Sequence, residues 1–109
     1  MCTQEGEEVT DERLIRLGLL VGEDGLAKLA RAHVCVVGLG GVGGSCVMAL
    51  ARSGVGRLTL IDGDAVEKSN FNRQAIADGQ TLGLPKPEAA AAKVAAINPA
   101  IREIGRAHV

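Results

Sequence analysis

The sequence predicts an α/β fold built around a parallel β-sheet. Two apolar runs rich in β-branched residues, at 33–38 and 57–62, are typical of strands buried in a parallel sheet. Between them lies an apolar segment, 46–54, that suits a helix closing at Gly54. A strand, a helix and a second strand in this order form a β–α–β unit with a right-handed connection. We therefore expect a parallel sheet with helices on both faces.

The residues before the first strand predict two short helices. The chain has 109 residues, enough for one small domain, and its polar residues 1–10 are expected to form a loose leader. Apolar residues at helical spacing predict a helix over 11–20, with Asp11 as its N-cap. Residues 22–32 predict a second helix whose basic residues come late, where the helix dipole favours them.

The residues after the second strand predict one more helix. Residues 63–84 are polar and have little periodicity. Pro87 then begins an Ala-rich helix that ends at Asn98, because Pro99 disfavours helix at the residue before it. A third strand should follow, and residues 100–109 are left to supply it. Two clear strands offer little apolar face, so we expect the sheet to be incomplete.

Composition excludes several function classes. The formal net charge is −1, so a general attraction to nucleic acid or membranes is not expected. Phe71 is the single aromatic residue, which excludes a stacking platform for single-stranded nucleic acid. Residues 1–10 lack the apolar core of a signal peptide, and no apolar stretch is long enough to span a bilayer. A cytoplasmic protein without a membrane partner is predicted.

The cysteines do not suggest a metal site. Cys2, Cys35 and Cys46 are scattered, without a CxxC or Cys/His spacing. An odd, scattered set indicates a reducing compartment. Cys35 falls in the first strand and Cys46 in the following helix, so we expect both to be buried.

The most informative motif is Gly38-x-Gly40-x-x-Gly43, between the first strand and its helix. Glycines there permit a tight turn and let backbone N–H groups approach a phosphate at the helix N-terminus. Asp62 follows about 20 residues later, at the end of the second strand, where this fingerprint requires an acid to hold a ribose hydroxyl. Together they predict a Rossmann-like nucleotide site. The alternative is that the glycines serve only a tight strand–helix crossing.

The glycines do not choose between a dinucleotide and ATP. A Walker P-loop is excluded, because no Gly-Lys-Ser/Thr follows the loop. ATP would therefore need cations from elsewhere, and Arg73 and Lys86 flank the polar segment after Asp62. A cation about 4 Å from a phosphate gains roughly 4 kcal/mol at an effective dielectric near 20. The alternative is a solvated loop whose charges contact nothing.

Longer strings carry a family resemblance. GLGGVG (38–43), ALARSGVGRLTLIDGDAVEKSNFNRQ (49–74), TLGLPK (81–86) and INP (97–99) together resemble the adenylating domain shared by ubiquitin-activating, ThiF-like and MoeB-like enzymes. The resemblance runs from about Arg13 to Ile101. The leader residues 13–16 and 19–25, with Asn72-Arg73-Gln74, are most similar to the branch of tRNA threonylcarbamoyladenosine dehydratases.

This resemblance implies ATP-dependent adenylation of a carboxylate. In the dehydratase branch the carboxylate belongs to the threonylcarbamoyl group of a tRNA, and AMP as leaving group allows ring closure with loss of water. In the MoeB and ThiF branches it is the C-terminal glycine of a ubiquitin-like sulfur carrier. ATP and Mg²⁺ are the implied cofactors, and a homodimer the implied assembly of the full-length protein. An NAD-dependent oxidoreductase and a non-catalytic dimerising partner are the alternatives from other classes.

The resemblance also implies roles for the nucleotide-binding residues. The glycine pattern forms the loop, and Gly41 lets the backbone approach the nucleotide. Asp62 holds the ribose, while Asp64 lies beside the phosphates and helps to position Mg²⁺.

A second group of residues is implied to act in catalysis. Asn70, Arg73 and Lys86 meet the triphosphate and stabilise the charge that develops on the leaving pyrophosphate. Arg16 resembles an arginine that family dimers donate to the partner's active site; the alternative is an ordinary helix-surface arginine.

The end of the chain raises a separate hypothesis. Family members continue well beyond this length, so we expect residues 11–102 to be the N-terminal part of an adenylating domain that is inactive alone. Residues 103–109 do not resemble the family's third strand. They can be encoded by GAG ATC GGA AGA GCA CAC GTC, a common sequencing adapter, which predicts a non-native tail. The underlying nucleotides test this hypothesis.

Overall fold

The computed structural model describes residues 12–109, so the predicted leader and the Asp11 cap lie outside the described residues. The elements in chain order are η1 (Glu12–Leu14), α2 (Ile15–Arg31), β1 (His33–Val37), α3 (Gly41–Arg52), β2 (Arg57–Asp62), η2 (Lys68–Asn70), α4 (Lys86–Ile97) and β3 (Glu103–His108). This order confirms the predicted β–α–β unit and extends it by a helix and a third strand.

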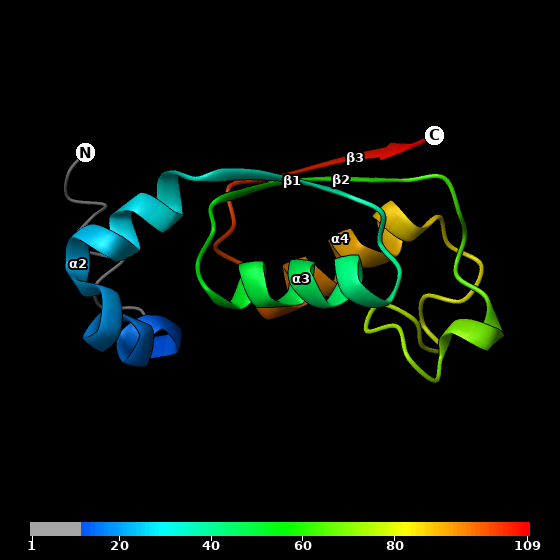
Figure 1. Cartoon of the computed structure of the whole chain (residues 1–109), viewed down its shortest axis with the longest axis horizontal. Coiled ribbons are helices and arrows are strands. Elements are labelled where there is room, and N and C mark those ends of the chain that lie inside the picture. Colours follow the sequence, from blue (N-terminus) through cyan, green and yellow to red (C-terminus); the bar gives the residue numbers. More distant parts are fainter. Residues whose placement is uncertain (1–11) are drawn as a thin grey trace.

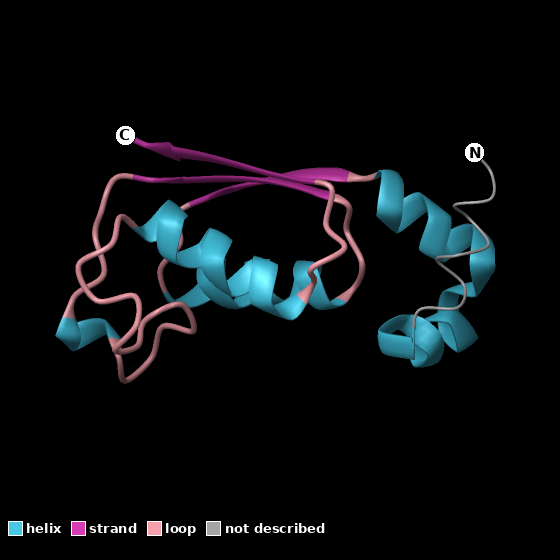
Figure 2. Ribbon diagram, turned by 180° about the vertical axis from the view of Figure 1, so that it is seen from behind, coloured by secondary structure: helices cyan, strands magenta, loops and turns pink. Residues whose placement is uncertain are grey.

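The sheet has three parallel strands in the order β1-β2-β3. Both α3 and α4 lie on one face of this sheet and pack against each other (Figures 1 and 2). Successive right-handed connections that step in one direction across a sheet place their helices on the same side. The predicted α/β fold with a parallel sheet is confirmed. We expected helices on both faces of the sheet. Within residues 12–109, α3 and α4 both cover the same face.

The core fills the space between the sheet and the two helices. Leu58 and Leu60 of β2 are fully buried, and they meet Val47 of α3 and Val94 of α4 in one cluster. The short side chains of Ala89, Ala90 and Ala91 are buried in the same cluster. Small residues let α4 approach the central strand closely, since packed interiors leave few voids.

Gly22 divides α2 into two helical pieces. Its backbone has φ 75° and ψ 174°, which is not helical. A positive φ is readily available to glycine and rarely to other residues. The sequence prediction of one helix before Gly22 and another after it is therefore confirmed. Figure 1 shows α2 beyond the start of β1, away from the ends of the strands that lead into the helices.

The prediction that Cys35 and Cys46 are buried was wrong. Both thiols are free and exposed. On β1, Val34 and Val36 point toward the core, so Cys35 falls on the sheet face that α3 and α4 do not cover. On α3 the buried side carries Val47, and its neighbour Cys46 lies outside that side. An apolar run alone does not indicate which face of an element will be covered.

The residues expected to form a non-native tail are part of the sheet. Glu103–His108 is β3, and it pairs with β2 from Arg57↔Glu103 to Asp62↔His108. Ile104 is half-buried and packs against the core. The nucleotide origin of residues 103–109 stays a prediction, but they supply the third strand that the sequence requires.

Candidate nucleotide-binding site

The candidate site lies where β1 and β2 end. The loop after β1, the end of β2, η2 and the start of α4 gather at the same end of the molecule (Figure 1). In open α/β sheets, ligands bind in the crevice outside the carboxyl ends of the strands. The topology therefore brings the glycine loop and the acid of β2 together, as the sequence predicts.

The glycines of the loop serve different purposes. Gly38 has φ 89°, and a Cβ on Gly43 would lie 1.7 Å from the carbonyl oxygen of Gly38. These two glycines are thus required by the tight strand–helix crossing. A Cβ on Gly41 would meet nothing within 4 Å, so this position faces open space. Because Gly40 is the N-cap, α3 begins at Gly41 and not at Cys46 as expected, and the first N–H groups of α3 have no partner within the helix.

Asp62 fixes the glycine loop to the end of β2. Its Oδ2 accepts the backbone N–H of Leu39 at 2.6 Å, and its Oδ1 accepts the backbone N–H of Asp64 at 2.7 Å. Burial alone raises the pKa of Asp62, but the N–H groups of Leu39 and Asp64 and the charge of Lys86 outweigh it and hold the pKa below 3.8. Asp62 is therefore an anion near neutral pH, with lone pairs left to accept from a ligand hydroxyl.

Lys86 is a buried cation at the same end of the sheet. Lys86 is 7% exposed, and its backbone N–H donates to the carbonyl of Asp64 at 2.8 Å. Lys86 is the first residue of α4, one position before the predicted start at Pro87. A cation at a helix N-terminus opposes the helix dipole, and lysine is rarely buried without a partner. The fold thus holds a positive charge beside Asp62 at a local electrostatic cost.

The turn around η2 carries the other two residues predicted to meet phosphates. Asn70 is buried, and its Oδ1 accepts the backbone N–H of Glu67 at 2.9 Å, which completes the capping box of η2. Arg73 is exposed, and its Nη1 donates to the carbonyl of Ser69 at 2.8 Å and to Oδ1 of Asn72 at 3.1 Å. Asn70 therefore shapes the turn, while Arg73 is a surface cation whose guanidinium is held by residues of the same turn.

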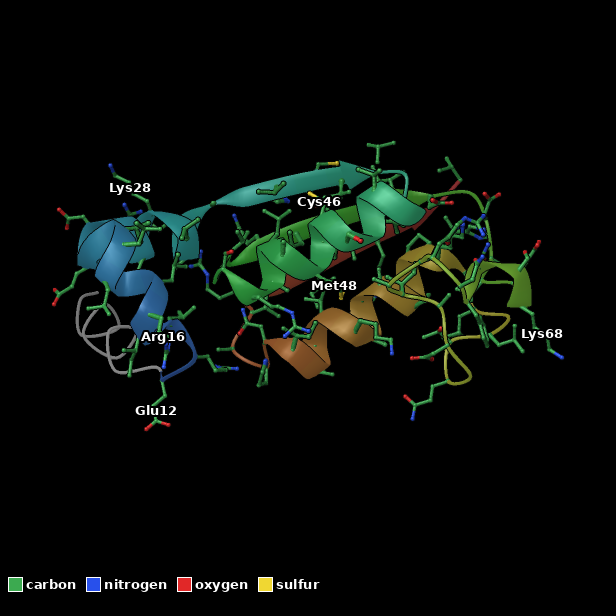
Figure 3. The ribbon with its side chains drawn as sticks, turned by 60° about the horizontal axis from the view of Figure 1, so that its bottom comes forward. Glu12, Arg16, Lys28, Cys46, Met48 and Lys68 are labelled. Atoms are coloured by element: carbon green, nitrogen blue, oxygen red, sulfur yellow. The ribbon has the colours of Figure 1, made fainter. Side chains whose placement is uncertain are left out.

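Asp64 and Arg16 lie in different places. Asp64 is exposed and follows Asp62 closely, joined to it by the hydrogen bond above. Arg16 is on α2, at the opposite end of the molecule from Lys68 of η2 (Figure 3). Within one chain, the structure does not bring Arg16 to the glycine loop. Among residues 12–109, no three His, Cys, Asp or Glu side chains gather closely enough to hold a metal ion.

Gln74 was missed as a site residue by the sequence reasoning. Gln74 is 8% exposed, and its Nε2 lies 3.7 Å from the position that a Cβ on Gly40 would take. Its Oε1 is buried and has no hydrogen-bond partner within the described part of the chain. The available signal was the adjacency of Gln74 to Arg73 in the Asn-Arg-Gln motif.

Comparison with solved structures supports the same fold. Crystal structures of the E. coli tRNA N6-threonylcarbamoyladenosine dehydratase TcdA, one in complex with ATP and one with AMP, each match with a TM-score of 0.85 and 42% identity. The match covers 90% of this chain and 39–40% of theirs. No helix in the described range 12–109 has the length and apolar character needed to cross a membrane.

Comparison with curated proteins gives the family. The tRNA threonylcarbamoyladenosine dehydratase of Haemophilus influenzae is 48% identical over 89 residues, which are 82% of this chain and 34% of that protein. The molybdopterin-synthase adenylyltransferase of Salmonella typhimurium is 43% identical over 99 residues, 86% of this chain and 40% of that protein. The chain thus spans about a third of the length of the dehydratases it matches. Because the ThiF family also matches residues 12–107, the chain belongs to the ThiF family.

Proposed function

We propose that this chain supplies the ATP-binding part of an enzyme that adenylates a carboxylate. The observation that carries the proposal is the position of Asp62, which is ionised, bound to the glycine loop through Leu39 and faced by the buried Lys86. An acid at this position suits a ribose, and a cation beside it suits the phosphates of the same nucleotide. Binding of ATP by structural relatives supports this choice over NAD.

The proposed chemistry asks the protein mainly to position groups and to balance charge. A carboxylate oxygen of the substrate forms a bond to the α-phosphorus of ATP, and the bond from that phosphorus to the bridging oxygen breaks, with its electrons leaving on pyrophosphate. Lys86 and Arg73 would offset the charge that develops there, together with the first N–H groups of α3. Mg²⁺ would be held largely by the phosphates, with Asp64 beside it, since magnesium commonly keeps few protein ligands.

For the substrate, we propose the threonylcarbamoyl group of a tRNA, whose activated carboxylate then closes a ring with release of AMP. The higher identity to the dehydratases than to the molybdopterin-synthase adenylyltransferase supports this branch. Arg16 would then act from the second subunit of a homodimer, because it lies far from η2 within its own chain. A cytoplasmic location follows from such a substrate.

Nucleotide titration tests the proposal. Calorimetry of the 109-residue chain with Mg²⁺ should detect binding of ATP and little or none of NAD. An Asp62→Ala variant should lose ATP binding, whereas Asp24→Ala, on the exposed surface of α2, should retain it. Equal binding of ATP and NAD, or ATP binding that survives loss of Asp62, would overturn the proposal.

A further inference from the structure

The carboxamide of Gln74 is buried against the glycine loop with an unused acceptor. Its Nε2 faces Gly40, the N-cap of α3, and its Oε1 has no hydrogen-bond donor among residues 12–109. The backbone of Gln74 is anchored on both sides, because its N–H donates to Asn70 at 2.9 Å and its carbonyl accepts from Ala77 at 3.0 Å. The side chain is therefore held at the loop by a fixed piece of backbone.

Packing alone does not account for a glutamine here. Buried polar atoms in folded proteins nearly always have partners, and an unpartnered one destabilises the fold. Ile76 and Ala77, close by in the sequence, are buried apolar residues of the core, whereas Gln74 is buried with a polar side chain. A buried glutamine with an unused acceptor beside the glycine loop points to a ligand that supplies the missing donor.

We propose that Gln74 is a nucleotide-contacting residue whose Oε1 accepts a hydrogen bond from a ribose hydroxyl of ATP. This inference rests on the proposed function, because it adds a contact to the same nucleotide site. An amide oxygen needs a donor, and the phosphates of ATP offer none at neutral pH. The donors of the nucleotide are its ribose hydroxyls and the amino group of adenine.

The geometry favours the ribose over the adenine. Asp62, the predicted ribose ligand, binds Leu39, and Gly40 is the next residue along the loop. Gln74 thus approaches the same short stretch of backbone from the side of η2, while Asp62 approaches it from the end of β2. A sugar placed on Asp62 would have both a carboxylate and a carboxamide oxygen as acceptors.

The test is a cycle that combines a Gln74→Met variant with ATP analogues. Methionine keeps the length and volume of glutamine but lacks its polar atoms. ATP, 2′-deoxy-ATP and 3′-deoxy-ATP are titrated into wild type and variant by calorimetry. We expect Gln74→Met to weaken ATP binding about tenfold, and to remove most of the affinity difference between ATP and one of the deoxy analogues. Gln80→Met, at an exposed position, is the control and should change nothing.

Thermal unfolding without nucleotide separates this role from a structural one. Because Oε1 is unpartnered, Gln74→Met should leave the unfolding temperature unchanged or raise it. A marked fall would show that Gln74 supports the fold and would overturn the inference. The inference would also be overturned if each deoxy analogue bound more weakly than ATP by the same factor in wild type and in Gln74→Met. It would likewise be overturned if Gln74→Met instead removed the affinity difference between ATP and inosine triphosphate, which lacks the adenine amino group. Failure of the wild-type chain to bind ATP would instead reject the proposed function and this inference together.

Discussion

Asp62 and Leu39 are joined by a hydrogen bond of 2.6 Å that ties the end of β2 to the loop following β1. The carboxylate proposed to hold the ribose therefore also sets the position of the glycine loop. Its second oxygen orders the next turn through Asp64. Binding and local structure thus depend on one ionised group, which makes the site sensitive to the charge of Asp62.

Asp62→Asn should weaken nucleotide binding and should lower the free energy of unfolding by an amount that depends on pH. The pKa of Asp62 is lower in the folded protein than its ordinary value of 3.8. The stability that the ionised carboxylate contributes is therefore fully present above pH 3.8 and is lost as the pH falls through the folded pKa. At neutral pH the variant should be less stable by about 1 kcal/mol, a small value because the group is only partly buried.

Urea unfolding of wild type and Asp62→Asn at several pH values between about 7 and 3 measures this difference. The gap between the two proteins should be constant near neutrality and should narrow below about pH 4. A gap that widens toward acid would contradict the lowered pKa.

Two glycines of the loop should respond oppositely to alanine. Gly43→Ala should destabilise the fold by more than about 2 kcal/mol, because its Cβ would collide with the backbone at Gly38. Gly41→Ala has room for its Cβ and improves helix propensity, so the fold should be as stable or up to about 1 kcal/mol more stable.

The same Cβ at Gly41 would project into the open space beside the loop, where we propose that the nucleotide approaches. We expect Gly41→Ala to weaken ATP binding at least tenfold in calorimetry without a loss of unfolding temperature. Unchanged affinity in this folded variant would mean that the nucleotide does not approach the loop at Gly41.

Lys86→Met should separate stability from binding. The variant removes a buried cation from the N-terminus of α4, where it opposes the helix dipole, and keeps the apolar stem. Its free energy of unfolding should stay within about 1 kcal/mol of wild type, while ATP affinity should fall at least tenfold. Lys68→Met, on the exposed surface of η2, is the matched control for both measurements. A loss of ATP affinity in Lys68→Met as large as in Lys86→Met would argue against a specific role for Lys86.

The contribution of β3 is testable at Ile104. This side chain packs against the core, so Ile104→Ala should lower the free energy of unfolding by about 1–3 kcal/mol. Val109 is 84% exposed, and Val109→Ala should have an effect below about 0.5 kcal/mol. If denaturant unfolding showed a negligible loss of stability for Ile104→Ala as well as for Val109→Ala, residues 103–108 would not form the third strand in solution.

Much of the fold follows from local patterns, and the failures have physical causes. The β-branched runs located β1 and β2, and the positive φ of Gly22 matches the predicted break in α2. The early start of α3 was missed, because glycine is a poor helix former and its role there is to allow a close approach to β1. The exposure of Cys35 depends on which sheet face the helices cover, which no local pattern contains.

The site was predicted in the same uneven way. Asp62 and Lys86 stand out by charge and position, and the structure brings them together. Gln74 stands next to Arg73 in the sequence, but that adjacency does not reveal its burial against Gly40, a residue distant in the sequence. Arg16 lies at the opposite end of the molecule from the site (Figure 3), so a role for it in the site requires a second subunit.

An NMR titration of the ¹⁵N-labelled chain with ATP and Mg²⁺ shows directly whether ATP binds at the glycine loop. We expect the backbone amide signals of Leu39 to Gly43 and of Asp64 to shift together, with NAD producing little change at the same concentration. Shifts confined to α2, or an equal response to NAD at the glycine loop, would contradict the assignment of this end of the sheet as an ATP site.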